Sequence, residues 1–223
     1  MAAELWTIVL MRGIDRSKSR LAAAIGDAGR ARLNRWLLVH TLQVIERWRG
    51  DLKYCAVVSP CDQALELAQR AGADVVREMD GANDPNRAAA RGVTHAAAHG
   101  AGKVLVLCCD LPDLTAESLH ALANEAGLRR HMVLAPDTAG TGTNALLVDA
   151  CLDLGFSFGE RSYARHCEWA AARGWTISVC ARPALGFDLD TPQDLAAWSN
   201  RQGRITPGLD GKIYVPTPGE LAG

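Results

Sequence analysis

The 223-residue sequence predicts a single-domain α/β protein with a mostly parallel sheet and helices on both faces. Two observations lead to this prediction. Unbroken apolar runs rich in β-branched residues recur along the chain, and such runs are typical of strands that are buried on both faces. Helix-like segments with an apolar stripe lie between these runs. Strands that alternate with helices form βαβ units and hence a parallel sheet.

The expected strands coincide with the apolar runs, at residues 5–11, 54–58, 104–109, 132–135, 145–148 and 175–180. The expected helices cover residues 27–48, 63–71, 87–99, 116–126, 163–173 and 192–200. Asp27, Thr115 and Thr191 stand at the start of three of these helices, where a side-chain oxygen can accept a hydrogen bond from a free backbone N–H. We interpret these three residues as N-caps.

One domain is expected for residues 1–200, because a chain of this length commonly builds one substantial core. Residues 201–223 are rich in glycine and proline, which predicts an extended C-terminal tail and no further helix or strand. We interpret the tail as an appendage. Packing on a neighbouring subunit of a homodimer is one use that such a tail would have.

The composition argues against a membrane or nucleic-acid partner. The longest apolar runs are much shorter than a membrane-spanning helix. The net charge is −1, whereas nucleic acids and anionic membranes favour a concentrated basic surface. The seven cysteines are scattered without a C-x-x-C pair, and the first 11 residues lack the pattern of a secretory signal. We therefore expect a cytoplasmic protein with reduced thiols.

Three aspartates follow predicted strands, at the edge of the sheet where α/β proteins bind ligands. Asp110 comes directly after the strand at residues 104–109, and Asp188 and Asp190 have the period-two spacing that points two side chains of an extended segment the same way. Like charges at this spacing repel unless a cation lies between them. A turn acid and a helix cap are the alternatives, but three acids at two strand ends favour Mg²⁺.

Three polar loops are expected beside these acids. Residues 12–20 contain four positively charged side chains, which can hold a triphosphate although they do not form a Walker loop. Residues 138–144 (TAGTGTN) and 158–162 (FGERS) offer backbone N–H groups to a small anion. Solvated loops and ordinary turns explain each segment taken alone. Their combination near the acids favours anion binding.

Two other side-chain pairs are not given a functional role. His95 and His99 have the i,i+4 spacing of a zinc pair, but only alanines lie between them and no glutamate is placed as a base. We therefore expect a solvent-facing pair. Cys108 and Cys109 are interpreted as residues on alternate faces of a buried strand.

Five segments in order carry a resemblance to a known family: KSRLA, CDLPDLT, APDTAGTGTNALL, FGERSYARH and DLDTPQDL. Over residues 8–195 the chain resembles the guanylyltransferases of coenzyme F420 biosynthesis, the CofC/FbiD family. The resemblance implies a Rossmann-like nucleotide-diphospho-sugar transferase fold of the MobA type. It also implies transfer of GMP from GTP to phosphoenolpyruvate, 2-phospho-L-lactate or 3-phospho-D-glycerate. The product would pass to the next enzyme of that pathway.

The resemblance further implies roles for individual residues. The expected Mg²⁺ ligands are Asp110, Asp188 and Asp190. The residues expected to bind the nucleotide are Arg12, Lys18, Arg20 and Asn86. The residues expected to bind the acceptor acid are Thr143, Gly159 and Ser162. Asp110 and Lys18 are the expected catalytic residues. Two segments depart from the family pattern, because the family's VPxK and GLNxA stretches are replaced at residues 10–12 and 84–88.

The expected reaction is attack by an acceptor phosphate oxygen on the α-phosphorus of GTP, with release of pyrophosphate. A phosphate monoester has a second pKa of about 6 and is largely ionised at neutral pH, so no general base is required. Two alternatives stay open. One is another transferase of the same fold, acting on molybdopterin or a sugar phosphate, although residues 12–21 do not match its GxSxRMGxxK loop. The other is a nucleotide-binding protein without turnover.

Overall fold

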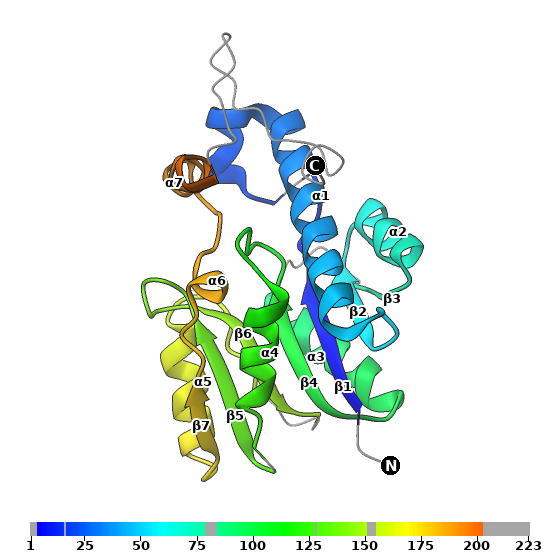
Figure 1. Ribbon diagram of the computed structural model, residues 1–223, viewed down its shortest axis with the longest axis vertical. Helices are drawn as coiled ribbons and strands as arrows, with labels where there is room; N and C mark the ends of the chain where they lie inside the picture. The colour runs from blue at the N-terminus through cyan, green and yellow to red at the C-terminus, as the bar shows by residue number, and fades with distance from the viewer. Residues whose placement is uncertain (1–3, 16, 79–83, 128, 151–154, 203–223) are drawn as a thin grey trace.

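A seven-stranded sheet forms the centre of the protein (Figure 1). The computed structural model describes residues 4–15, 17–78, 84–127, 129–150 and 155–202. The strands are β1 (Glu4–Leu10), β2 (Cys55–Ser59), β3 (Asp74–Arg77), β4 (Ala101–Cys108), β5 (His131–Pro136), β6 (Thr143–Asp149) and β7 (Thr176–Val179). Their order is β3-β2-β1-β4-β6-β5-β7, and neighbours are parallel except that β6 runs antiparallel to β4 and β5.

Helices cover both faces of this sheet. They are η1 (Ser19–Leu21), α1 (Ala22–Arg49), α2 (Asp62–Ala71), α3 (Pro85–Ala98), α4 (Ala116–Asn124), α5 (Ser162–Ala171), α6 (Pro183–Gly186) and α7 (Pro192–Gln202). Residues of α1, α2 and α4 share one apolar core with the sheet. Residues of α3 and α5 form the second core on the opposite face. The predicted α/β architecture is therefore confirmed.

Alternate strand residues enter the two cores. Ile8 packs with α3 on one face and Val9 packs with α1 on the other, and both are fully buried. Leu105 and Val106 of β4 divide in the same way. A strand with helices on both sides has no polar face, because its successive side chains point to opposite sides of the sheet. This arrangement explains the unbroken apolar runs in the sequence.

A third apolar cluster joins α7 to the first part of α1, and Figure 1 shows these two helices side by side. Leu21, Trp36, Leu189 and Trp198 are buried in it. Trp198 also donates from Nε1 to Asp113 Oδ1 at 3.1 Å, which ties α7 to the loop after β4. The segment before α7 is thereby held over the end of the sheet.

The structure departs from the expected elements in several places. The short strand β3 and the single-turn helix α6 were not anticipated, because four residues give no recognisable period. The N-caps at Thr115 and Thr191 are confirmed, since each exchanges hydrogen bonds with a residue three positions later. The N-cap at Asp27 is wrong. The expected helix start is nearly right, because Gly26 (φ 64°, ψ 177°) breaks α1 and a helix resumes next to Asp27, but the Asp27 carboxylate pairs with Arg30 instead of a backbone N–H.

Residues 203–223 of the expected tail lie outside the described residues. The first two residues assigned to the tail, 201 and 202, are the last residues of α7. Within the described ranges, no helix combines the length and apolar character that crossing a membrane requires.

Candidate active site

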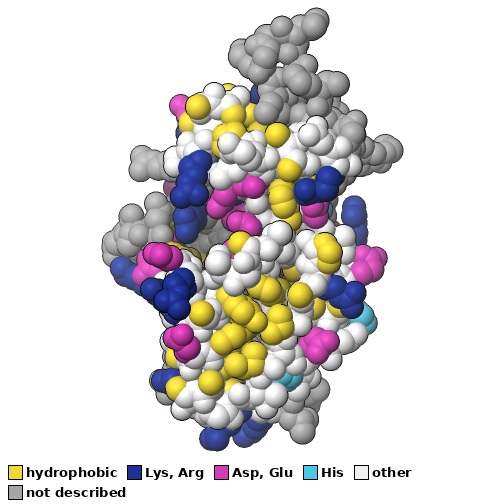
Figure 2. Space-filling view, turned by 90° about the vertical axis from the view of Figure 1, so that its left-hand side faces the viewer, with side chains coloured by type: hydrophobic (Ala, Val, Ile, Leu, Met, Phe, Trp, Pro, Cys, Tyr) yellow, Lys and Arg dark blue, Asp and Glu magenta, His cyan; other side chains and the backbone are white. Residues whose placement is uncertain are grey.

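A pocket of about 270 Å³ opens at the carboxyl ends of β1, β2 and β4. The antiparallel direction of β6 brings its first residue, Thr143, to the same edge of the sheet. The predicted site residues that line the pocket are Arg12, Lys18, Asp110, Thr143, Gly159, Ser162, Asp188 and Asp190. Arg20 and Asn86 are outside this lining. Figure 2 shows acidic side chains gathered beside basic ones in the upper half of one face of the molecule.

The two acidic segments meet around Lys18. The Leu189 N–H donates to the Asp110 carbonyl at 3.0 Å, which holds residues 188–190 against the loop after β4. Lys18 Nζ donates to the Leu189 carbonyl at 2.5 Å and to Asp190 Oδ1 at 2.9 Å, and it lies 3.8 Å from Asp110 Oδ2. The predicted convergence of these acids is confirmed. Asp188 and Asp190 reach the pocket from the segment between α6 and α7, however, and not directly from a strand.

Burial is the largest influence on the pKa of each of these three acids. Burial raises the pKa of Asp110, and the Lys18 charge offsets this only in part. Burial and the Asp110 charge raise the pKa of Asp188 to about 6. Burial also acts on Asp190, but Lys18 brings the pKa of that carboxyl below its usual value. Burial opposes the charge of Lys18 itself, yet Asp110 and Asp190 raise its pKa.

The acid cluster can accommodate a further cation. Among the described residues, Asp110 Oδ1 is a buried oxygen without a hydrogen-bond partner. A buried carboxylate oxygen without a partner, beside a second acid of raised pKa, gains from an added positive charge. One oxygen taken from each of the three carboxylates does not lie within 4.8 Å of the other two. The Lys18 ammonium lies between Asp110 and Asp190. The donor set fits Mg²⁺, and cation binding would require these side chains to move closer.

The basic loop is shaped by α1, which the sequence pattern did not reveal. Asn34 Nδ2 donates to the Ile14 carbonyl at 2.8 Å, and Arg30 Nη1 donates to the Ser17 carbonyl at 2.9 Å. Lys18 has a left-handed backbone with φ 57° and ψ 45°. Such a conformation costs a non-glycine residue about 1–3 kcal/mol and persists only where its surroundings hold it. The sequence signal for this contact was the presence of two polar residues, Arg30 and Asn34, at buried positions of α1.

The acceptor side of the pocket is built on β6 and α5. Thr143 and Ser162 are buried polar residues, at the first positions of these two elements. Thr143 Oγ1 lies 3.1 Å from Nδ1 of His166, whose Nε2 lies 3.0 Å from the Ser157 backbone N. Burial lowers the pKa of His166 to about 4. The sequence reasoning did not single out His166, although it is the last residue of the quoted FGERSYARH segment.

Asn86 braces this acceptor side and does not enter the pocket. Its Oδ1 accepts from the Phe158 N–H at 2.6 Å, and its Nδ2 donates to the Phe158 carbonyl at 3.2 Å. Both amide atoms are therefore occupied, and this placement does not favour the predicted contact with the nucleotide. Arg20 is exposed outside the pocket lining, but it is near enough to Asp190 to lower the pKa of that carboxyl.

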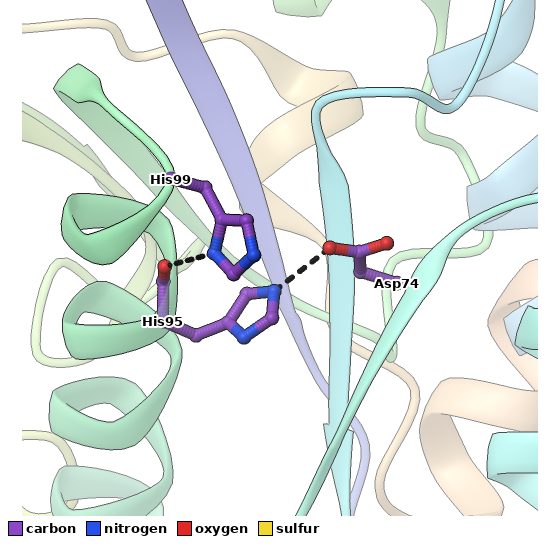
Figure 3. Close-up of side chains that lie close together, drawn as sticks. All are labelled: Asp74, His95 and His99. Carbon is purple, nitrogen blue, oxygen red and sulfur yellow. Dashed lines mark hydrogen bonds and ion pairs between the residues drawn. The ribbon is translucent and has the colours of Figure 1, made fainter.

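The two pairs that were set aside have different outcomes. Cys108 packs towards the α3 core and Cys109 lies in the α1 core, so the expected alternation is confirmed. His95 and His99 do not both face solvent. His95 is half-buried and its Nε2 lies 2.8 Å from Asp74 Oδ2, whereas His99 is exposed (Figure 3). The expectation of a solvent-facing pair is wrong for His95.

Comparison with known proteins finds relatives over most of the chain. A model of the family described as guanylyl transferase CofC like matches residues 6–198. A phosphoenolpyruvate guanylyltransferase of Rubrobacter xylanophilus is 38% identical over 86% of this chain and 92% of its own. A 3-phospho-D-glycerate guanylyltransferase of Phenylobacterium zucineum is 36% identical over 84% of this chain and 86% of its own.

Solved structures show a shared fold at low sequence identity. A nucleotide-diphospho-sugar transferase of Desulfovibrio desulfuricans has a TM-score of 0.72 at 16% identity, over 91% of this chain and 89% of its own. A 4-diphosphocytidyl-2C-methyl-D-erythritol synthase of Anaerococcus prevotii has a TM-score of 0.62 at 11% identity, over 91% and 97%. The fold is thus common to several nucleotidyltransferases. The match of the family model over most of the chain is more specific, and it shows that this chain belongs to the family of CofC-like guanylyl transferases.

Proposed function

We propose that the protein transfers GMP from GTP to a small phosphorylated carboxylic acid in coenzyme F420 biosynthesis and releases pyrophosphate. The observation that supports this most is the composition of the pocket. One side gathers Asp110, Asp188 and Asp190 beside Lys18, and the other side offers Thr143 and Ser162 as buried polar groups. Such a pocket suits a cation-bound nucleotide beside a small anion.

The acid cluster would hold Mg²⁺ through Asp110, Asp188 and Asp190. When bound there, Mg²⁺ would supply charge neutralisation for the triphosphate and for the pyrophosphate that leaves. Lys18 keeps the acids from repelling one another before the nucleotide binds, because its ammonium lies between Asp110 and Asp190. Arg12 is exposed at the pocket and would contact the phosphates of GTP.

The chain needs no general base for this reaction, because the acceptor phosphate is already ionised at neutral pH. His166 is the histidine beside the acceptor side of the pocket, and its low pKa and two occupied ring nitrogens make it unsuitable as a base. The protein therefore acts by positioning the two substrates and neutralising their charge. Phosphate oxygen attack on the α-phosphorus then forms the diphosphate linkage.

The acceptor is one of three acids that pair a phosphate with a carboxylate: phosphoenolpyruvate, 2-phospho-L-lactate and 3-phospho-D-glycerate. Relatives of similar identity are named for phosphoenolpyruvate and for 3-phospho-D-glycerate. All three acids should therefore be tested. The cytoplasmic location, the homodimer and transfer of the product to the next enzyme stay predictions from the sequence.

The test is a pyrophosphate-release assay that combines GTP, ATP, CTP or UTP with each of the three acids, or with a sugar phosphate, in the presence of Mg²⁺. We expect turnover with GTP and one preferred acid, and loss of turnover when EDTA removes the metal. Asp190→Asn should lose activity, whereas Asp149→Asn is a matched control, since Asp149 pairs with Lys103 outside the pocket. Turnover with CTP and a sugar phosphate would support the cytidylyltransferase alternative. No turnover with any pair would support a nucleotide-binding protein.

A further inference from the structure

His166 has a defined partner on each nitrogen of its ring. The side chain is 1% exposed and lies on α5, with the Phe158 ring packed edge-on at 5.1 Å. The Ser157 backbone N lies 3.0 Å from Nε2, and Thr143 Oγ1 lies 3.1 Å from Nδ1. These two partners determine which nitrogen carries the proton.

A backbone N–H can only donate, so Nε2 must be the acceptor of the Ser157 hydrogen bond and carry no proton. A neutral imidazole then has its proton on Nδ1. Burial keeps the ring neutral, since it lowers the pKa of His166 to about 4. Nδ1–H therefore donates to Thr143 Oγ1.

The Thr143 hydroxyl oxygen accepts this hydrogen bond, so its own proton is directed elsewhere. Thr143 lines the pocket, and His166 is the partner that the described residues provide for Oγ1. We infer that His166 is a positioning residue that makes Thr143 a hydrogen-bond donor to an ionised oxygen of the acceptor acid. This inference rests on the proposed function. An ionised carboxylate or phosphate oxygen can only accept, so it suits the Thr143 hydroxyl as a donor. A ligand hydroxyl group that has to donate its own proton suits it less well.

The same ring also holds the loop that precedes α5. His166 fixes Ser157, and the neighbouring Phe158 is fixed through its N–H and carbonyl by Asn86. Gly159 and Ser162 follow directly, and the Ser162 N–H donates to the Gly159 carbonyl at 3.1 Å. His166 thus couples the orientation of the Thr143 hydroxyl to the position of the loop that carries the other predicted acceptor ligands.

Two substitutions separate the two hydrogen bonds of His166. Asparagine can place an amide donor near the position of Nδ1 and keep the bond to Thr143, whereas glutamine can place a carbonyl near Nε2 and keep the bond to Ser157. We expect His166→Gln to raise the KM of the acceptor about five- to tenfold, as expected for one lost hydrogen bond. The KM of GTP should stay unchanged. His166→Asn should leave the KM of the acceptor close to the wild-type value, because it keeps the hydrogen bond to Thr143.

Thr143→Val tests the coupling. We expect it to raise the acceptor KM as His166→Gln does, and the double variant His166→Gln/Thr143→Val should be no worse than Thr143→Val alone. Additive effects, or an equal rise in the KM of GTP, would overturn the inference.

A measurement without turnover keeps this inference separate from the proposed function. In protein labelled with ¹⁵N-histidine, NMR should show a neutral His166 ring with the proton on Nδ1 at pH values from about 5 to 8. The signal is assigned by its loss in His166→Gln, or by its shift in Thr143→Val if the former does not fold. A proton on Nε2, or a titration near the ordinary value, would contradict the inference. A protein that shows the expected ring but no guanylyl transfer would instead contradict the proposed function.

A second, independent observation concerns Asp74, His95 and His99, whose side chains point toward one another in Figure 3. One ligand atom from each lies within 4.8 Å of the other two. His99 Nδ1 lies 2.8 Å from the His95 carbonyl, which can only accept, so Nδ1 carries the proton and Nε2 keeps a free lone pair. For His99 this is the arrangement of a metal-ligating histidine, whose other nitrogen donates to a carbonyl or carboxylate. A metal bound here would replace the hydrogen bond between His95 Nε2 and Asp74 Oδ2.

We propose that these three residues form a site for a divalent transition metal such as Zn²⁺ or Ni²⁺. The imidazoles of His95, in the last turn of α3, and of His99, its C-cap residue, join a carboxylate on β3 in a ligand set that favours such ions over Mg²⁺. None of the three residues lines the pocket. The site is therefore distinct from the acid cluster at Asp110.

Calorimetric titration with Zn²⁺ in excess Mg²⁺ tests this site, because Mg²⁺ competes for the acid cluster. We expect one Zn²⁺ to bind at micromolar concentration and His99→Ala to weaken that binding at least about tenfold. His120→Ala is the matched control on α4. Ni²⁺ should also quench the fluorescence of Trp6, whose ring centroid lies 5.6 Å from those of both imidazoles. Ni²⁺ should quench the total tryptophan fluorescence less in Trp6→Phe than in the wild type. Unchanged binding in His99→Ala, or no binding by the wild type, would overturn the proposal.

Discussion

Replacement of Lys18 by methionine is the sharpest test of the charge balance in the pocket. The substitution removes the ammonium that lies between Asp110 and Asp190 and keeps a side chain of similar length. Both residues carry a Cβ, so the cost of the left-handed backbone at position 18 is the same in the two proteins. A change in stability therefore reports the lost ammonium, that is, its charge and the hydrogen bonds that it donates to Leu189 and Asp190.

The size of the effect follows from the exposure of the three side chains. Removal of one partner from a fully buried ion pair costs about 3–5 kcal/mol. Lys18 is 7% exposed, but Asp110 and Asp190 are 29% and 47% exposed, so water screens part of their charge. We expect a loss of about 2–3 kcal/mol in the free energy of unfolding. For a domain of this length, this loss corresponds to a fall in Tm of roughly 4–12 °C.

Thermal unfolding at neutral pH in EDTA provides the measurement, and a second series adds Mg²⁺. We expect Mg²⁺ to raise the Tm of Lys18→Met more than that of the wild type, because the cation replaces the missing positive charge. Lys103→Met is the matched control, since Lys103 Nζ lies 2.7 Å from Asp149 Oδ1 outside the pocket. Its loss of stability should not respond to Mg²⁺. An unchanged Tm for Lys18→Met would refute the charge balance, and an equal Mg²⁺ response in the two variants would refute the metal site.

Asp110→Asn should lower the rate of pyrophosphate release with GTP at least about 100-fold. Its Tm in EDTA should not fall, because the substitution removes a charge whose buried Oδ1 lacks a hydrogen-bond partner. Steady-state kinetics that retain wild-type turnover would contradict the first expectation. Acid should destabilise the protein through His166, because its pKa in the folded chain is about 4 and the unfolded chain takes up the proton first. This contribution to the free energy of unfolding is fully present above pH 6.5 and is lost towards pH 4, with a size of roughly 3 kcal/mol. In urea unfolding, the free energy of unfolding of His166→Gln should therefore depend less steeply on pH over this range. Asn86→Ala should raise the KM of the acceptor severalfold and leave the KM of GTP unchanged, since the amide holds Phe158; a change confined to the KM of GTP would support the nucleotide contact instead.

The pattern of apolar residues was sufficient to predict the central elements of the fold. Unbroken runs such as the one at β4 locate strands with helices on both faces, and Thr115 with Ser118 marks a helix start within four residues. These signals are local, because burial and capping act on residues that are near in sequence. The positions of Asp110 and Thr143 at the edge of the sheet could be predicted for the same reason, since Asp110 follows one recognisable strand and Thr143 begins another.

The tertiary structure decided how these residues face one another. The antiparallel direction of β6 depends on pairing with β4 and β5, and no residue of β6 alone specifies it. Lys18 lies against Asp190 across 172 positions of sequence, where the sequence predicted contact with the nucleotide. Asn86 binds the backbone of Phe158 across 72 positions, and His166 aligns with Thr143 because α5 packs beside the start of β6. Partners of this kind are set by the packing of distant segments, so the sequence determined which chemical groups reach the pocket and the fold determined which of them are free to bind a ligand.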